Sequence, residues 1–129
     1  MAKVFLDTNY FIDILGRKAP LKIVEPLNLN YVFVSSLSYH ILFYTYKIKV
    51  PSKKFEKVHK NFEIVGFTRE ILEKSLFGPT KDLEDNIQLH SAAEADCRFL
   101  LTNDKKLLRL KFFGKTQILN SLPELQSSS

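Results

Sequence analysis

The sequence predicts an α/β protein, a three-layer α/β/α sandwich built around a central, mainly parallel sheet. The runs Val4-Phe5-Leu6 and Phe99-Leu100-Leu101 are almost continuously apolar, as in strands that are buried on both faces of a parallel sheet. Strand-like and helix-like segments alternate along the chain, which favours right-handed crossovers between parallel strands. We expect the 129 residues to form one domain over residues 1–126, followed by a disordered tail at 127–129.

In the first half of the chain, turn and capping residues separate the expected elements. Thr8-Asn9 can cap a helix that Gly16 ends, and the residues from Tyr31 onward are β-branched and aromatic. The elements expected here are a strand at Lys3–Asp7, a helix from Tyr10 to about Leu15, a helix around Leu21–Leu27 interrupted by Pro26, a strand at Tyr31–Ser35, a helix capped by Ser36 or Ser38 that reaches about Lys47, and a helix from Pro51 to about Lys60.

In the second half, Gly78-Pro79-Thr80 separates two helices, and an acidic stretch opens the second of them. The expected elements are a strand at Phe62–Phe67, a helix capped by Thr68 that reaches Leu76, a helix from about Asp82 to Glu94, a strand at Phe99–Thr102, a helical turn at Lys105–Leu108, a strand at Thr116–Leu119 and a last turn at Leu122–Gln126.

Composition narrows the class of protein. The single cysteine, Cys97, excludes an internal disulfide and indicates a reducing compartment, and no apolar run approaches the roughly 18 residues of a membrane span. We therefore expect a cytoplasmic protein with no membrane association.

The net charge of +5 and the basic runs at 47–60 and 105–115 suit a polyanionic partner such as RNA, although each run also fits a solvated helix face. The four glycines form no phosphate-binding loop.

Aspartates follow both apolar strands. Asp7 comes directly after the first strand, and Asp104 follows Thr102-Asn103 after the fourth. Asp82 and Asp85 open the acidic helix. The carboxyl ends of parallel strands share one edge of the sheet, where ligands bind, and carboxylates gathered there repel one another unless a cation lies between them. Oxygen ligands suit Mg²⁺ or Mn²⁺, so the pattern predicts a metal-dependent enzyme.

Each acid also has a structural interpretation. Asp7 could bond backbone amides in a turn, Asp82 could cap the helix, and Asp104 could be a turn residue. Asp85 is different, because it shares a helix face with Gln88, Leu89 and Ala92 and would be costly to bury unless it is paired, metal-bound or hydrated.

Phosphodiester hydrolysis is the chemistry that such a cluster favours, since a bound metal neutralises phosphate charge and activates water. Thr102 and Asn103 could orient a ligand or the attacking water, while Thr8, Asn9 and Ser36 could support the metal ligands. A receiver-like phosphoacceptor domain fits less well. It needs an acidic pair near the first strand, where this chain has one acid.

Four blocks of sequence, taken in order, resemble the PIN-domain family over about residues 3–120, and most closely its toxin-type branch. The blocks are Phe5-Leu6-Asp7-Thr8-Asn9, Val34-Ser35-Ser36-Leu37-Ser38, Lys81-Asp82-Leu83-Glu84-Asp85-Asn86-Ile87-Gln88 and Leu101-Thr102-Asn103-Asp104. The resemblance implies an α/β/α sandwich and a pocket binding Mg²⁺ or Mn²⁺, in which Asp7, Asp85 and Asp104 match the metal-site acids and Asp82 a further catalytic acid. It also implies RNA cleavage, a toxin-like role with an antitoxin partner, and a homodimer.

The chain departs from the family pattern on one helix. Many PIN nucleases carry a glutamate where this chain reads Ser38-Tyr39-His40-Ile41, and no acid occurs between Glu25 and Glu56. Either Asp82 replaces the missing ligand, or His40 reaches the pocket, or the site binds metal weakly. Two functions follow: a divalent-metal-dependent endoribonuclease acting as a toxin, or a catalytically weakened nucleic-acid-binding or interaction module.

Overall fold

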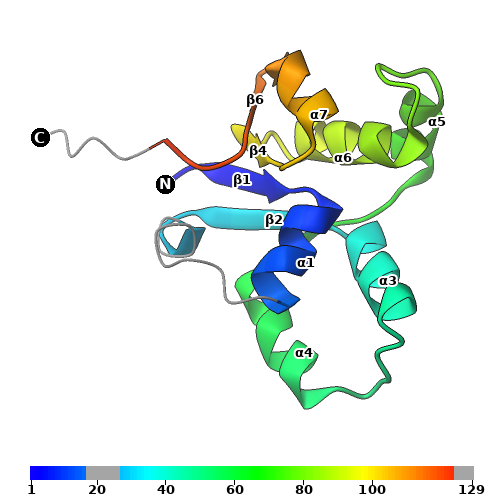
Figure 1. Ribbon diagram of the computed structural model, residues 1–129, viewed down its shortest axis with the longest axis vertical. Coiled ribbons are helices and arrows are strands. Elements are labelled where there is room, and N and C mark those ends of the chain that lie inside the picture. Colours follow the sequence, from blue (N-terminus) through cyan, green and yellow to red (C-terminus); the bar gives the residue numbers. More distant parts are fainter. Residues whose placement is uncertain (17–26, 124–129) are drawn as a thin grey trace, which may run out of the picture.

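A six-stranded sheet forms the centre of the molecule, in the strand order β3-β2-β1-β4-β6-β5. The computed structural model in Figure 1 describes residues 1–16 and 27–123. Its strands are β1 (Lys3–Leu6), β2 (Tyr31–Ser35), β3 (Glu63–Val65), β4 (Phe99–Leu101), β5 (Phe112–Phe113) and β6 (Thr116–Leu119). All neighbouring strands pair in parallel except β5 and β6, which are antiparallel. The predicted α/β class with a mainly parallel sheet is confirmed.

Helices cover both faces of this sheet, as Figure 1 shows, with α1, α3 and α4 on one side and α5, α6 and α7 on the other. Their bounds are α1 (Thr8–Gly16), α3 (Ser36–Thr45), α4 (Lys53–Val58), α5 (Arg69–Leu76), α6 (Leu83–Glu94) and α7 (Lys105–Leu110), with a 3-10 turn at His59–Asn61. None of the described helices combines the length and the apolar character that crossing a membrane requires.

The core lies in two layers because side chains alternate along each strand. Val4 and Leu6 of β1 pack with Phe11 of α1 on one face. Phe5 packs with Leu89 of α6 on the other face. All five side chains are fully or almost fully buried, which explains why β1 is apolar from Val4 to Leu6.

Helix starts differ slightly from the expected ones. Helix α1 begins at Thr8 rather than Tyr10, and Ser35, not Ser36 or Ser38, caps α3 by accepting from the N–H of Leu37. Both shifts have the same cause. The side-chain oxygens of Asp7 and Ser35, at the ends of the first two strands, already accept from the first N–H groups of the helices that follow. The caps predicted at Thr68 and Asp82 are confirmed.

Strand β5 is absent from the sequence-based prediction. It has two residues and turns back onto β6 through Gly114, whose φ of +60° lies in the left-handed region that glycine adopts readily. Two residues are too few to produce a recognisable alternation. The helix predicted from Pro51 to Lys60 is also divided, with α4 giving way to the 3-10 turn at His59. The helix predicted around Leu21–Leu27, the turn at Leu122–Gln126 and the tail lie wholly or partly outside the described residues.

Candidate functional site

The carboxyl edge of the sheet brings the ends of β1 and β4 together. Phe5 pairs with Leu100 and Leu6 with Leu101, and the N–H of Asp7 extends this ladder by donating to the carbonyl of Leu101 at 3.1 Å. Asp7 and Thr102 are therefore neighbours, as expected for residues that follow adjacent parallel strands.

Asp7 is buried, with 6% of its surface exposed, and both of its carboxylate oxygens accept hydrogen bonds. Oδ1 accepts from the backbone N–H of Tyr10 at 2.8 Å, which places Asp7 at the start of α1. Oδ2 accepts from the hydroxyl of Thr102. Burial is the largest influence on this group and raises the pKa of Asp7 to about 6, although both hydrogen bonds lower it. The carboxylate is thus held in one orientation at an electrostatic cost.

Thr102 links Asp7 to Asp104. Its fully buried hydroxyl donates to Asp7 and accepts from the N–H of Asp104 at 3.0 Å. Asp104 in turn caps α7, because its Oδ1 accepts from the N–H of Lys106 at 2.8 Å. The turn predicted for Asp104 is consistent with these bonds. The prediction that Thr102 orients a ligand or the attacking water stays a prediction.

The first turn of α6 carries the other acids. Asp82 caps the helix by accepting from the N–H of Asp85 at 2.9 Å. Asp85 is half-buried, and its desolvation, followed by repulsion from Asp82 and then Asp104, raises its pKa to about 6. Glu84 and Asp7 contribute further repulsion. These acids therefore repel one another electrostatically at the carboxyl edge of the sheet, although they come from three separate segments of the chain.

No cation neutralises this acidic site within the part of the chain that the structure describes. The two ion pairs recorded there, Arg69–Glu73 and Lys74–Glu70, both lie on α5. The acids of the site are thus uncompensated, which favours the binding of a cation from solution.

The donor set suits magnesium or manganese, but as it stands it does not form a closed cage. Among residues 1–16 and 27–123, no three His, Cys, Asp or Glu side chains lie close enough together to hold an ion. Mg²⁺ keeps several of its waters and is commonly held by only one or two carboxylates. Uncompensated carboxylates of this kind fit such partly hydrated binding, with Asp85 and Asp104 the more accessible ligands and Asp7 the buried one.

The supporting residues predicted from sequence are only partly brought together. Thr8 is buried, and its Oγ1 shares a hydrogen bond of 2.8 Å with Oγ of Ser38 on α3. Asn9 and Asn103 are exposed. The hydroxyl of Ser36 accepts from the N–H of Phe67 at 2.9 Å and so anchors the segment after β3.

Helix α3 contributes no acid to this edge. Its buried contact with the site is Ser38, through Thr8. His40 is exposed, and its ring stacks on that of Tyr44 with centroids 6.1 Å apart. The prediction that His40 supports the site therefore stays a prediction.

Two further buried polar residues, Asn86 and Gln88, lie on α6 close to Asp85 and were not predicted as site residues. Asn86 is almost fully buried and ties the loop before α6 to its surroundings: its Oδ1 accepts from the N–H of Thr80 at 2.8 Å, and its Nδ2 donates to the carbonyl of Ser75 at 2.8 Å. Gln88, one helical turn after Asp85, is 2% exposed, and its amide atoms have no partner among the described residues. The signal in the sequence is that both are polar residues of the acidic block, and that Gln88 shares a helix face with Asp85.

The chain was compared with models of known protein families. A family model described as PIN domain matches residues 4–113, which is most of the chain and includes every acid discussed above. No curated protein matches the chain. PIN domains are generally nucleases that use divalent metal ions.

Proposed function

The chain belongs to the PIN-domain family, and from this premise we propose that it is a divalent-metal-dependent endoribonuclease that hydrolyses RNA phosphodiester bonds. One observation carries the proposal beyond the family: Asp7, Asp85 and Asp104 converge on one edge of the sheet without a compensating cation among the described residues. Burial raises the pKa of Asp7 and of Asp85 to about 6 each, and repulsion from the neighbouring acids contributes in the same direction.

Each residue has a defined task in this proposal. One or two of the carboxylates of Asp7, Asp85 and Asp104 would bind the ion directly, with waters completing its coordination. A bound divalent ion would supply charge stabilisation for the phosphate and a more acidic water. The Thr102 hydroxyl donates to the carboxylate of Asp7 and so fixes its orientation. The same oxygen accepts from the backbone N–H of Asp104 and holds the backbone of that residue in place. Asp82 keeps Asp85 in place by capping α6. At neutral pH, above the pKa of about 6, Asp7 and Asp85 are ionised and available to a cation.

We also propose that the enzyme acts in the cytoplasm as the toxin of a toxin–antitoxin pair and forms a homodimer. The support is the toxin-type resemblance of the four sequence blocks. Expression of the wild-type chain should arrest the growth of a bacterial host, whereas Asp85→Asn should not. Equal growth with both chains would contradict the toxin role.

The test of the enzymatic proposal uses purified protein and mixed RNA with Mn²⁺ or Mg²⁺. Wild-type protein should cleave the RNA, and an excess of chelator should stop cleavage. Asp85→Asn should lose cleavage and also the rise in melting temperature that Mn²⁺ causes in the wild type, because a ligand stabilises only the state that binds it. Asp96→Asn, a change of an exposed acid near the opposite end of α6, is the matched control.

A second candidate is a catalytically weakened nucleic-acid-binding or interaction module. The observation that favours it is the contact of α3 with the site through Ser38 rather than through a carboxylate. In that case millimolar Mn²⁺ would leave the melting temperature unchanged and RNA would be bound without being cut.

A further inference from the structure

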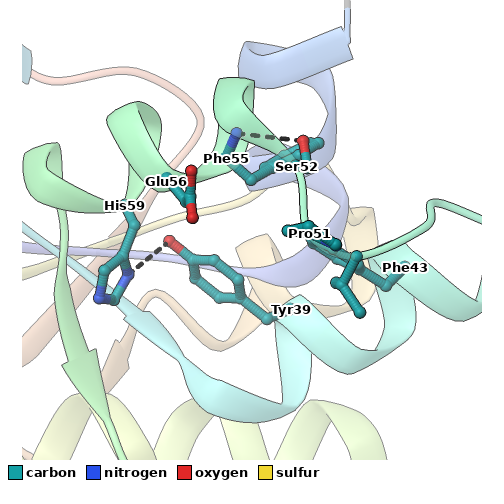
Figure 2. Close-up of a pocket in the computed structure, with 8 residues that line it drawn as sticks. Tyr39, Phe43, Pro51, Ser52, Phe55, Glu56 and His59 are labelled. Atoms are coloured by element: carbon teal, nitrogen blue, oxygen red, sulfur yellow. Dashed lines mark hydrogen bonds between the residues drawn. The ribbon is translucent and has the colours of Figure 1, made fainter.

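A cavity lies between α3 and α4, away from the acidic edge, and Figure 2 shows the side chains around it. Its volume is about 320 Å³, and its lining is almost entirely apolar. Four rings contribute to the walls, those of Tyr39, Phe43, Phe55 and His59. Ser52 and Glu56 also line the cavity.

The rings are held in place by one another. Tyr39 meets His59 edge to face, with centroids 5.8 Å apart and planes at 86°, and the Tyr39 hydroxyl shares a hydrogen bond of 3.3 Å with Nδ1 of His59. Phe43 and Phe55 pack at 4.9 Å. Behind them, Phe11 of the core packs against Tyr39 at 5.2 Å. The cavity is therefore preformed, which lowers the entropy cost of binding a flat ligand.

The segments that form the cavity are rich in lysine. The α3–α4 connection, α4 and the turn after it carry the exposed lysines Lys47, Lys49, Lys53, Lys54, Lys57 and Lys60. In the described part of the chain none of these lysines forms an ion pair. Lys54 lies over the ring of Phe55, with its Nζ 5.6 Å from the centroid. An occupant that combines a flat apolar group with negative charge is complementary to this surface.

We propose that the α3–α4 cavity binds one unstacked base of a single-stranded RNA, while the surrounding lysines contact the phosphates on either side. The inference rests on the proposed nuclease function and adds a binding subsite outside the acidic edge. Aromatic faces stack on any base, and lysines give the affinity its dependence on salt. The Glu56 carboxylate, at the edge of the cavity, can accept from the polar edge of a base.

The position of the cavity suits a strand that also reaches the acids. Ser38 of α3 contacts Thr8, next to Asp7, and the following residue, Tyr39, lines the cavity. The acidic edge and the cavity thus border different sides of α3, and an α-helix is about 10–12 Å in diameter. A strand that passes around the start of α3 contacts both.

The shape of the cavity favours a base over an acidic protein helix. A helix that docks in a groove inserts a row of side chains spaced at i, i+3, i+4 and i+7 and needs an elongated channel. Here the four rings line one open space of about 320 Å³, between two helices of ten and six residues. One planar group fills such a space.

Fluorescence anisotropy tests the proposal in the presence of EDTA, so that no cleavage occurs. The probes are a fluorescein-labelled, mixed-sequence RNA decamer and a decamer of the same length that lacks its bases. The wild-type protein should bind the RNA about fivefold or more tightly than the abasic decamer, since stacking of one base is worth about 1–3 kcal/mol. Phe55→Leu, which keeps an apolar side chain but removes the ring, should abolish most of this preference.

Val50→Glu and Leu76→Glu are a matched pair. Both replace exposed apolar residues, 76% and 65% exposed, but only Val50 borders the cavity. Val50→Glu should weaken RNA binding several-fold more than Leu76→Glu. Because neither side chain is in the core, the comparison remains valid if Phe55→Leu fails to fold.

Equal binding of RNA and the abasic decamer by the wild type would overturn the proposal. If Val50→Glu and Leu76→Glu weakened RNA binding equally, the proposal would also be overturned, and a protein segment would be the better candidate for the cavity. Failure of the nuclease proposal gives a different result: base-dependent binding in EDTA would persist, and only cleavage with Mn²⁺ would be absent.

Discussion

Replacing Asp7 by asparagine should stabilise the folded protein in the absence of divalent ions, and it should do so only above about pH 5. The pKa of Asp7 is about 6 in the folded protein, against an ordinary value of 3.8. Because the folded state holds this proton more tightly than the unfolded chain, stability falls as the pH rises from about 4 to 6. Ionised Asp7 then costs about 3 kcal/mol at pH 8.

Asparagine removes that cost but alters one hydrogen bond. Its Oδ1 can still accept from the N–H of Tyr10, while its Nδ2 faces the Thr102 hydroxyl in place of an accepting oxygen. We assign about 1 kcal/mol to this exchange. Asp7→Asn should therefore exceed the wild type in unfolding free energy by about 2 kcal/mol at pH 8, and the difference should fall to about zero between pH 4 and 5.

Urea denaturation in EDTA at pH 8 and at pH 4.5 measures both values. Asp96→Asn, which changes an exposed carboxylate, should alter stability by less than about 0.5 kcal/mol at either pH. If Asp7→Asn were destabilising at pH 8, or if its effect were the same at both pH values, the attribution of the raised pKa to burial would be refuted. Added Mn²⁺ should reverse the order of the two proteins at pH 8, because it stabilises only the chain with the full set of carboxylates.

Two further predictions concern residues outside the set of acids. Asn86→Ala should lower the unfolding free energy by about 2–3 kcal/mol in a urea titration, since it leaves the carbonyl of Ser75 and the N–H of Thr80 without their side-chain partner; an effect below 0.5 kcal/mol would show that the loop before α6 does not depend on it. Cys97 is 2% exposed, and burial raises its pKa to about 12, so iodoacetamide at pH 8 should label it only after unfolding in urea, as mass spectrometry can detect; rapid labelling of the native protein would contradict this account.

The two acids with raised pKa values, Asp7 and Asp85, are held in place by neighbouring residues of the sheet and of α6. Asp7 is oriented by a strand end and by Thr102, and Asp85 by the cap that Asp82 provides. Neither group is stabilised by an ion pair in the part of the chain described here. The stability of the sheet and helices offsets the repulsion between these carboxylates. This is common at sites that bind a ligand in a defined geometry.

From the sequence alone, the class of fold was predictable, and so was the placement of Asp7 and Asp104 after neighbouring strands of the sheet. Continuous apolar runs such as Val4–Leu6 are local features that require burial on both faces of a sheet, and residues after such strands must meet at one edge. The caps at Thr68 and Asp82 were predictable for the same reason, because a capping oxygen acts within a few residues of its own position.

Other features were decided only by the tertiary structure, because they depend on which segments meet. The hydroxyl of Thr102 bonds Asp7 across 95 positions of sequence, and Ser38 rather than an acid approaches the site from α3. The ring-lined cavity needs α3 and α4 to close around it, and strand β5 exists only because β6 is there to pair with it. No local pattern encodes these contacts, since each arises from packing between elements that are distant along the chain or too short to be recognised individually.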